Sequence, residues 1–330
     1  MPRVLVTGGL GFIGSAFARR LATDGWQVRV LDNGLRVSGG AEGLPGEVEV
    51  VRGDVRDPGV VHAAVSGCDR VCHLAAVNGT RHFYERPVLV LDVGVRGILN
   101  VLDACVAERV GDLVVVSSSE VYQSPDVVPT DETVALSIPD ALNPRYSYAG
   151  SKIITELLAI NYGREHLARV VVCRPHNVYG PAMGWDHVIP ELIARLRRLA
   201  AAGAPGEIAL PVQGSGEETR AFVYIDDFVD GLMTLVDKGA HLGIYHVGTT
   251  EEVTVADLAG RLAAQLGLRA RIVPGAPASG ATTRRCPDIA RMLDLGWTPR
   301  VALDQGLAHT VAWYVAHEPP EATALEGHAR

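Results

Sequence analysis

Lysine is almost absent from this sequence. Of the 30 basic residues in the 330-residue chain, only Lys152 and Lys238 are lysines, and the other 28 are arginines. We attribute the skew as a whole to compositional bias of the genome. Because arginine supplies nearly all other positive charge, Lys152 becomes a candidate for chemistry that needs a compact ammonium group rather than a planar guanidinium fork.

Paired cysteines and long apolar runs are absent too. The five cysteines are scattered and include no CxxC pair of the kind that binds zinc, so we expect no metal site and reduced thiols in a cytoplasmic protein. No apolar stretch reaches about 18 residues without a charge, which argues against a membrane-spanning helix. The residues that follow Met1 lack the basic, apolar and small-residue succession of a secretory signal peptide.

Net positive charge is lacking as well. The chain carries 38 acidic residues against 30 basic ones, and its net charge of −8 provides no electrostatic footprint for nucleic acid or an anionic membrane surface. We therefore expect neither as a partner. With 48% hydrophobic and 21% charged residues, the chain has enough apolar surface for a large buried core and is too apolar to be disordered.

Short β-branched runs alternate with longer amphipathic patterns in the first half of the chain. Such runs, apolar on both faces, are typical of parallel strands in βαβ units. We therefore predict an α/β fold with a doubly wound parallel sheet of the Rossmann type. The predicted strands are Val4–Val6, Val28–Leu31, Val48–Val51, Arg70–Leu74, Leu113–Ser117 and Val170–Arg174.

The pattern changes after Pro175, where glycine and proline interrupt the segments. We predict a first domain over residues 1–175, a smaller mixed domain over 176–315 and a flexible tail over 316–330. Tyr245–Val247 has the pattern of a later strand, so segments near 220–250 are expected to return to the first sheet. The predicted helices of this half are Val188–Ala202, Ile225–Lys238 and Val255–Gly267.

A glycine-rich turn with the spacing GxxGxxG joins the first predicted strand to a helix. Gly8 would permit the tight turn, Gly11 would let the backbone approach a pyrophosphate, and Gly14 would let the helix pack closely on the sheet. A pyrophosphate would then lie at the helix N-terminus, near Phe12 and Ile13, where unpaired N–H groups point toward it.

Asp32 closes the second predicted strand and selects the cofactor. A carboxylate there accepts hydrogen bonds from the ribose hydroxyls and repels a 2′-phosphate, which favours NAD over NADP. Arg36 lies nearby and is interpreted as a solvated loop arginine. His73 closes an apolar run and is assigned a structural role. The remaining predicted cofactor contacts follow the strand ends along one crevice: Asn33, Asp54, Val55, Leu74, Ala75 and Ala76.

A serine cluster combined with a Tyr-x-x-x-Lys motif is the strongest signal in the chain. The segment Ser117–Glu120 follows the fifth predicted strand, and Tyr148 and Lys152 lie further on. In a helix, positions i and i+4 share one face, so these two side chains would point into the same crevice. A nearby ammonium favours the phenolate and lowers the tyrosine pKa toward a range useful for a base.

Together these motifs resemble an extended short-chain dehydrogenase/reductase of the nucleotide-sugar epimerase, dehydratase and decarboxylase group. The resemblance runs from Val4 to about Tyr314 and implies NAD as the cofactor and a nucleotide-diphosphate sugar as the substrate. It further implies that Tyr148 removes a proton from a sugar hydroxyl, usually O4, while hydride passes from C4 to NAD. Ser118 would assist the tyrosine, and Lys152 would bind the nicotinamide ribose.

The second half of the chain carries three segments that resemble family motifs. Arg174–Pro181 is similar to an R-x-x-N-x-x-GP segment, and Arg220 and Arg285 lie in contexts similar to those of diphosphate-binding and C-terminal signature segments. Paired charge-assisted bonds suit arginine to a diphosphate, with solvated surface arginines as the alternative. For His176, packing is the alternative. The resemblance implies substrate contacts from Asn78, Thr80, Ser119, His176, Asn177, Arg220 and Arg285, and cofactor contacts from Ser117, Tyr148, Lys152 and Pro175.

The residues around a 4-keto sugar decide which reaction follows. A 4,6-dehydratase usually places Asp and Glu where this chain has Ser119 and Glu120, and serine is a poor general acid, so dehydration is disfavoured. A decarboxylase of the UDP-glucuronate type, using Glu120 and Arg285, is the alternative, although Ala182 stands where those enzymes often carry arginine. A 4-epimerase needs least beyond the shared residues and is our first prediction, with a retained-ketone oxidoreductase third.

The resemblance also implies a homodimer, formed through the helices near Ile98–Ala107 and Ser151–Tyr162. A non-catalytic NAD-binding or redox-sensing protein on the same fold would be expected to lack the tyrosine, the lysine or the serine, and all three are present.

Overall fold

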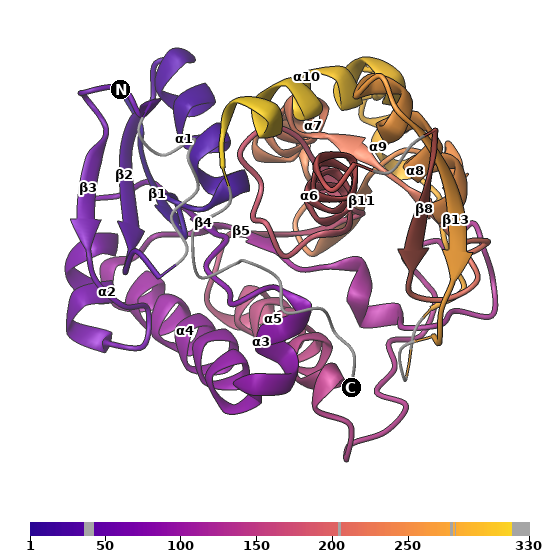
Figure 1. Cartoon of the computed structure of the whole chain (residues 1–330). Helices are drawn as coiled ribbons and strands as arrows, with labels where there is room; N and C mark the ends of the chain where they lie inside the picture. The colour runs from indigo at the N-terminus through magenta and orange to yellow at the C-terminus, as the bar shows by residue number, and fades with distance from the viewer. Residues whose placement is uncertain (36–42, 204–205, 278–279, 281, 319–330) are drawn as a thin grey trace.

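A seven-stranded parallel sheet forms the centre of the molecule (Figure 1). The structure is a computed structural model and describes residues 1–35, 43–203, 206–277, 280 and 282–318. The strand order is β11-β6-β5-β4-β1-β2-β3, and every neighbouring pair is parallel, which confirms the predicted Rossmann-type sheet. The strands are β1 (Arg3–Thr7), β2 (Gln27–Asp32), β3 (Glu49–Arg52), β4 (Arg70–His73), β5 (Asp112–Val116), β6 (Arg169–Pro175) and β11 (Gly243–Val247).

Helices cover both faces of this sheet. Along β1, Val4 and Val6 belong to one hydrophobic core and Leu5 to the other, which explains why the strand sequences are apolar without alternation. The first core includes α1 (Phe12–Thr23) and α7 (Ile225–Lys238). The second core includes the helices α2 (Pro58–Val65), α4 (Pro87–Glu108) and α5 (Ser147–Glu165).

The second half of the chain contributes one strand to the central sheet and builds several small sheets beside it. The strand predicted at Tyr245–Val247 lies within β11, which pairs in parallel with β6. The small sheets are β7 (Val178–Tyr179) with β10 (Val223–Tyr224), β8 (Glu207–Val212) with β13 (Arg269–Pro274), and β9 (Thr219–Ala221) with β12 (Glu252–Thr254) and β14 (Arg284–Arg285). The other helices are α3 (Thr80–Glu85), α6 (Val188–Ala201), α8 (Val255–Gln265), α9 (Ala290–Asp294) and α10 (Leu303–Ala316).

Element boundaries differ slightly from those expected. Leu74 and Ser117 lie just beyond β4 and β5, and α8 ends at Gln265, because Gly267 takes a positive φ of 70° that a helix cannot continue. Of the predicted tail, the residues from 319 onward lie outside those described. Among the described helices, none combines the length and apolar character that a membrane span requires.

Candidate active site

The glycine turn after β1 leaves no room for side chains. Gly8 has a φ of 71°, and a β-carbon there would lie 2.8 Å from the Cα of Ala75. A β-carbon on Gly14 would lie 2.1 Å from the carbonyl oxygen of Gly8. Among the described residues, no side chain caps the N-terminus of α1 at Gly11, so its first N–H groups are available to an anion. This cradle fits the pyrophosphate of a dinucleotide.

Acidic and amide side chains gather at the ends of β2 and β3. The carboxylate of Asp32 accepts hydrogen bonds from the backbone N–H groups of Leu10 (3.0 Å) and Gly34 (2.8 Å), which fix it beside the glycine turn. Asn33 donates to Asp54 at 3.0 Å. The Arg56 guanidinium holds the pKa of Asp54 well below its usual range. Val55 is buried next to Asp54, and Arg36 lies outside the described residues.

His73, at the end of β4, contacts Thr7 at the end of β1. Its Nδ1 lies 2.8 Å from Oγ1 of Thr7, and the same oxygen accepts from the N–H groups of Leu74 and Ala75 at 3.2 Å. Burial, followed by the positive charge of Lys152, lowers the pKa of His73 to about 3, so the ring is neutral. These contacts support its structural role, and they place Leu74 and Ala75 against the glycine turn.

Tyr148 and Lys152 lie one helical turn apart on α5, and both side chains are buried. The Lys152 ammonium donates to the carbonyl oxygen of Val116 at 2.7 Å and lies 5.8 Å from the centre of the Tyr148 ring. The Tyr148 ring also stacks on Phe83 of α3, with ring centroids 5.0 Å apart. Burial lowers the pKa of Lys152 to about 8, and the Glu156 carboxylate acts in the opposite direction.

The three serines that follow β5 have different surroundings. Ser117 donates to Glu156, which also forms a buried ion pair with Arg174 at 2.6 Å, so the Ser117 hydroxyl belongs to a buried polar network. Ser118 begins the 3₁₀ turn of residues 119–122, and its Oγ accepts from the N–H of Glu120 at 3.1 Å. Ser119 is buried in that turn.

Glu120 forms an ion pair with Arg285 at 2.5 Å, although 165 residues separate them. Burial alone would raise the pKa of Glu120, but the opposing charges, Arg285 first among them, lower it overall. Arg220 lies in the same cluster, where its terminal nitrogens donate to the carbonyls of Thr219 (2.7 Å) and Thr282 (2.6 Å). Burial, with Arg285 next, lowers the pKa of Arg220 to about 10.

His176 and Asn177 directly follow Pro175, the last residue of β6. Asn177 takes a positive φ of 41° and donates through Nδ2 to the carbonyl of Ala221 at 2.9 Å, which fastens this turn to β9. His176 is buried, and neither of its ring nitrogens has a hydrogen-bond partner among the described residues. Burial first, and then the neighbouring His246, lowers the pKa of His176 well below its ordinary value.

Two further predicted substrate residues, Asn78 and Thr80, lie at the start of α3, the helix whose Phe83 stacks on Tyr148. Both residues are exposed, and the side-chain oxygen Oδ1 of Asn78 accepts from the N–H of Gly79 at 2.8 Å. Sequence reasoning missed Phe83 and Glu156. Glu156 continues the i+4 spacing of Tyr148 and Lys152 along α5, so helical periodicity could have found it.

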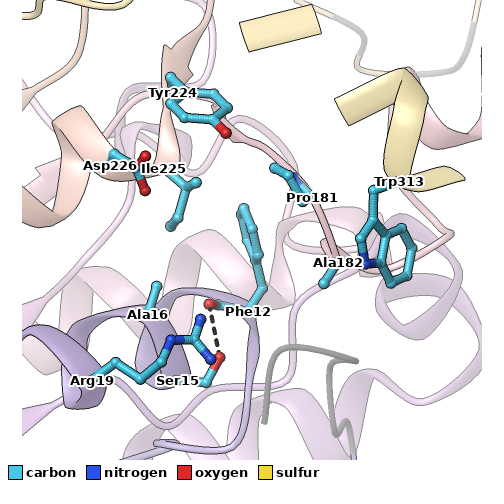
Figure 2. Close-up of a pocket in the computed structure, with 10 residues that line it drawn as sticks. All are labelled: Phe12, Ser15, Ala16, Arg19, Pro181, Ala182, Tyr224, Ile225, Asp226 and Trp313. Atoms are coloured by element: carbon cyan, nitrogen blue, oxygen red, sulfur yellow. Dashed lines mark hydrogen bonds between the residues drawn. The ribbon is translucent and has the colours of Figure 1, made fainter. Parts of the chain in front are cut away.

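A cavity of about 230 Å³ lies between α1, the turn at Pro181 and Ala182, the start of α7 and Trp313 of α10 (Figure 2). Of the predicted site residues only Phe12 lines it, and the candidate base is not among its walls. The lining residues are Phe12, Ser15, Ala16, Arg19, Pro181, Ala182, Tyr224, Ile225, Asp226 and Trp313.

Comparison with known proteins finds relatives that are named as enzymes of nucleotide sugars. The chain is 36% identical to a dTDP-4-dehydro-6-deoxy-D-allose reductase from a Streptomyces species, over 96% of this chain and 97% of that protein. It is 33% identical to UDP-glucuronic acid decarboxylase 4 from Arabidopsis thaliana, over 92% of this chain and 67% of that protein.

A solved structure of UDP-glucose 4-epimerase with UDP-glucose, from Thermotoga maritima, superposes with a TM-score of 0.84. It is 27% identical and covers 95% of this chain and 99% of its own. Residues 4–248 match the model of the NAD dependent epimerase/dehydratase family. That match includes both the glycine cradle and the Tyr148–Lys152 pair. The chain belongs to this family of NAD-dependent enzymes that modify nucleotide sugars, and its cofactor is NAD.

Proposed function

We propose that this protein is a nucleotide-sugar 4-epimerase that works through a transient 4-keto sugar. The observation that carries the proposal is the buried pair Tyr148 and Lys152, placed on one face of α5 beside the end of β5. Similarity to a UDP-glucose 4-epimerase supports it. In this assignment residues 1–175, together with β11, hold the cofactor, and residues 176–315 contribute most of the substrate contacts.

Each residue has a distinct task in the proposed reaction. Tyr148 accepts the proton of the C4 hydroxyl, and Ser118 offers a hydrogen bond to the same oxygen. Lys152, fixed by the carbonyl of Val116, binds the nicotinamide ribose and places a positive charge near the Tyr148 ring. Bound NAD would supply the acceptor and donor for the C4 hydride. Asp32 and the glycine turn hold the cofactor's ribose and pyrophosphate.

The charge state of Glu120 favours epimerisation over reactions that need a second acid. Its ion pair with Arg285 and its lowered pKa keep the carboxyl group ionised near neutral pH, where it donates no proton. Ser119 occupies the neighbouring position and is a poor acid. Epimerisation requires only that the 4-keto sugar present its other face to the returning hydride, so it uses no acid beyond Tyr148.

Decarboxylation of a sugar of the UDP-glucuronate type is the second candidate. The Nε of Arg285 is buried and lacks a hydrogen-bond partner among the described residues, so it is available to a sugar carboxylate. Similarity to UDP-glucuronic acid decarboxylase 4 supports this candidate. The ketone beside the uronate carboxylate would stabilise the enolate left by loss of carbon dioxide, and a proton would then complete the product. The C4 hydride step is common to both candidates.

Product analysis with a substrate panel tests the proposal. The protein is incubated with UDP-, GDP-, dTDP- and CDP-sugars, including UDP-glucuronate, and the products are examined by mass spectrometry and NMR. We expect unchanged mass and an inverted C4 signal. Loss of carbon dioxide from the uronate would contradict the proposed epimerisation and support decarboxylation.

Two tyrosine variants on α5 provide the control for this experiment. Tyr148→Phe removes the proposed base and should abolish turnover. Tyr162→Phe removes a hydroxyl that donates to Asp103 at 2.8 Å near the other end of the helix, and it should leave turnover unchanged. Full activity in a folded Tyr148→Phe protein would contradict the proposal.

We also propose a homodimer built on α4 and α5. These helices pack side by side, and they leave apolar side chains exposed to solvent: Val88, Leu91, Ile154 and Leu157. Exposed apolar side chains gathered on neighbouring helices are typical of an interface. A cytoplasmic location fits the five cysteines, all of which are free and buried.

A further inference from the structure

Phe83 places a buried aromatic ring against the candidate base, Tyr148. It is the buried residue of α3, a helix of six residues that follows the end of β4 and lies against the start of α5 (Figure 1). The two ring centroids lie 5.0 Å apart and the ring planes differ by only 13°, so the rings form a stacked pair. The contact brings α3 into the catalytic site, although Phe83 carries no group that can exchange a proton.

Phe83 is itself held by its surroundings. Its N–H donates to the carbonyl of Gly79 at 3.3 Å, in the first turn of α3. Its side chain belongs to the same hydrophobic core as Val90 and Val93 of α4, the next helix along the chain. Because side chains in such a core are closely packed, the Phe83 ring has little freedom to move and presents a fixed surface to Tyr148.

The backbone of α5 alone does not fix the direction of the Tyr148 ring. A helix places the Cα and Cβ atoms, and rotations about the side-chain bonds then decide where the hydroxyl lies. The Lys152 ammonium lies 5.8 Å from the centre of the ring, near the outer limit of a cation–π contact, so it restrains the ring weakly. Stacking on Phe83 weakens as soon as the Tyr148 ring tilts or slides. The stack is therefore a direct restraint on the orientation of the ring.

We propose that Phe83 is a positioning residue, which holds the Tyr148 ring in the orientation in which its hydroxyl reaches the C4 hydroxyl of the sugar. The inference rests on the proposed function in taking Tyr148 as the base. Phe83 acts only through the ring that it holds. A misplacement of about 1 Å can slow a reaction about a hundredfold, so a contact of this kind can control the rate.

Kinetics of Phe83→Leu, measured on the substrate found in the product panel, test the inference. Leucine keeps an apolar side chain in the core but offers no ring face. We expect kcat to fall by about tenfold or more while KM changes by less than about twofold. With the sugar deuterated at C4, the isotope effect on kcat should increase, because proton and hydride transfer become slower relative to binding and release. Phe83→Tyr keeps the ring and should retain a kcat close to that of the wild type.

A matched core variant separates positioning from loss of stability. Val61→Ala removes buried volume from the same hydrophobic core, on α2, and should lower stability but leave kcat and the isotope effect of the folded protein unchanged.

The isotope effect decides the task of Phe83, and the identity of the product decides the proposed function. The C4 hydride step is common to both candidate reactions, so the comparison applies to whichever product the panel yields. An isotope effect in Phe83→Leu no larger than that of the wild type would overturn the inference, and so would a Phe83→Tyr protein as slow as Phe83→Leu. A wild type that converts none of the sugars would overturn both.

Discussion

Lys152 shows why a chain so rich in arginine keeps a lysine at this position. Its ammonium occupies a buried space between the carbonyl of Val116 and the ring of Tyr148. A guanidinium group is broader and planar, and it cannot lose its proton near neutral pH. Lys238, in contrast, lies in the last turn of α7 and donates to the carbonyl of Leu295 at 2.9 Å, a contact that arginine can also make.

The two lysines form a matched pair of substitutions. We expect Lys152→Arg to lower kcat by about a hundredfold or more, because the larger group displaces the ammonium from the position that serves Tyr148. Lys238→Arg should leave kcat unchanged. Steady-state kinetics on the substrate found in the product panel measures both. Near-wild-type activity in Lys152→Arg would show that this lysine has no catalytic task.

At the scale of elements, α5 organises the site through its spacing. Tyr148, Lys152 and Glu156 follow one another at intervals of four residues, so one face carries the base, the ammonium and a carboxylate. Glu156 is buried in an ion pair with Arg174 of β6, which ties the helix to the sheet. The same carboxylate raises the pKa of Lys152 against the effect of burial.

Removing the charge of Glu156 should move the alkaline limit of activity. Lys152 is charged below its pKa of about 8 and loses its proton as the pH rises. Glu156→Gln preserves the side-chain shape but removes the negative charge, so the pKa of Lys152 falls further. As the pH rises, activity should therefore begin to decline at a lower pH than in the wild type. The pH profile of kcat/KM measures this shift. An unmoved alkaline limb in a folded variant would show that Glu156 is purely structural.

How much of the site follows from sequence depends on whether its geometry is local. The glycine turn and the Tyr148–Lys152 spacing are fixed by neighbouring residues, so the sequence predicts them. The pairing of Glu120 with Arg285 depends on how the second half of the chain folds back onto the sheet. The stacking of Phe83 on Tyr148 likewise depends on how α3 packs against α5. Fold class was predictable because continuous apolar runs alternate with helical patterns over the whole first half.

For the whole molecule, buried neutral histidines link stability to pH. Burial lowers the pKa of His73 to about 3 and that of His246 to about 4. An unfolded histidine binds its proton near pH 6.5, so between that pH and the folded pKa the unfolded state holds more protons. The free energy of unfolding therefore decreases as the pH falls below 6.5, by about 1.4 kcal/mol per pH unit for each such histidine.

A pair of histidine variants tests this linkage. His73→Gln removes one buried titrating group, so the loss of stability between pH 6.5 and pH 5 should be smaller than in the wild type by about 2 kcal/mol. His62→Gln changes a side chain that is 51% exposed and should leave the difference unchanged. Urea unfolding at the two pH values measures it. Equal pH dependence in all three proteins would contradict the assignment.

The proposed dimer is also a property of the whole molecule. Leu157 is 54% exposed on α5, and a charge there would have to be buried in the interface. Leu157→Glu should therefore produce monomers, and Leu142→Glu, at a side chain that is 92% exposed on a loop outside these helices, should not. Light scattering coupled to size-exclusion chromatography measures the mass. A wild-type protein that elutes as a monomer would contradict the proposed dimer.

In the proposed reaction, the substrate's own C4 hydrogen leaves as hydride and returns within one active site. A nucleotide sugar deuterated at C4, taken from the substrates found in the panel, tests it most directly. We expect slower turnover than with the unlabelled sugar, deuterium retained at C4 of the product, and no product from Tyr148→Phe. Product whose C4 deuterium has exchanged with solvent, formed at the unlabelled rate, would contradict it.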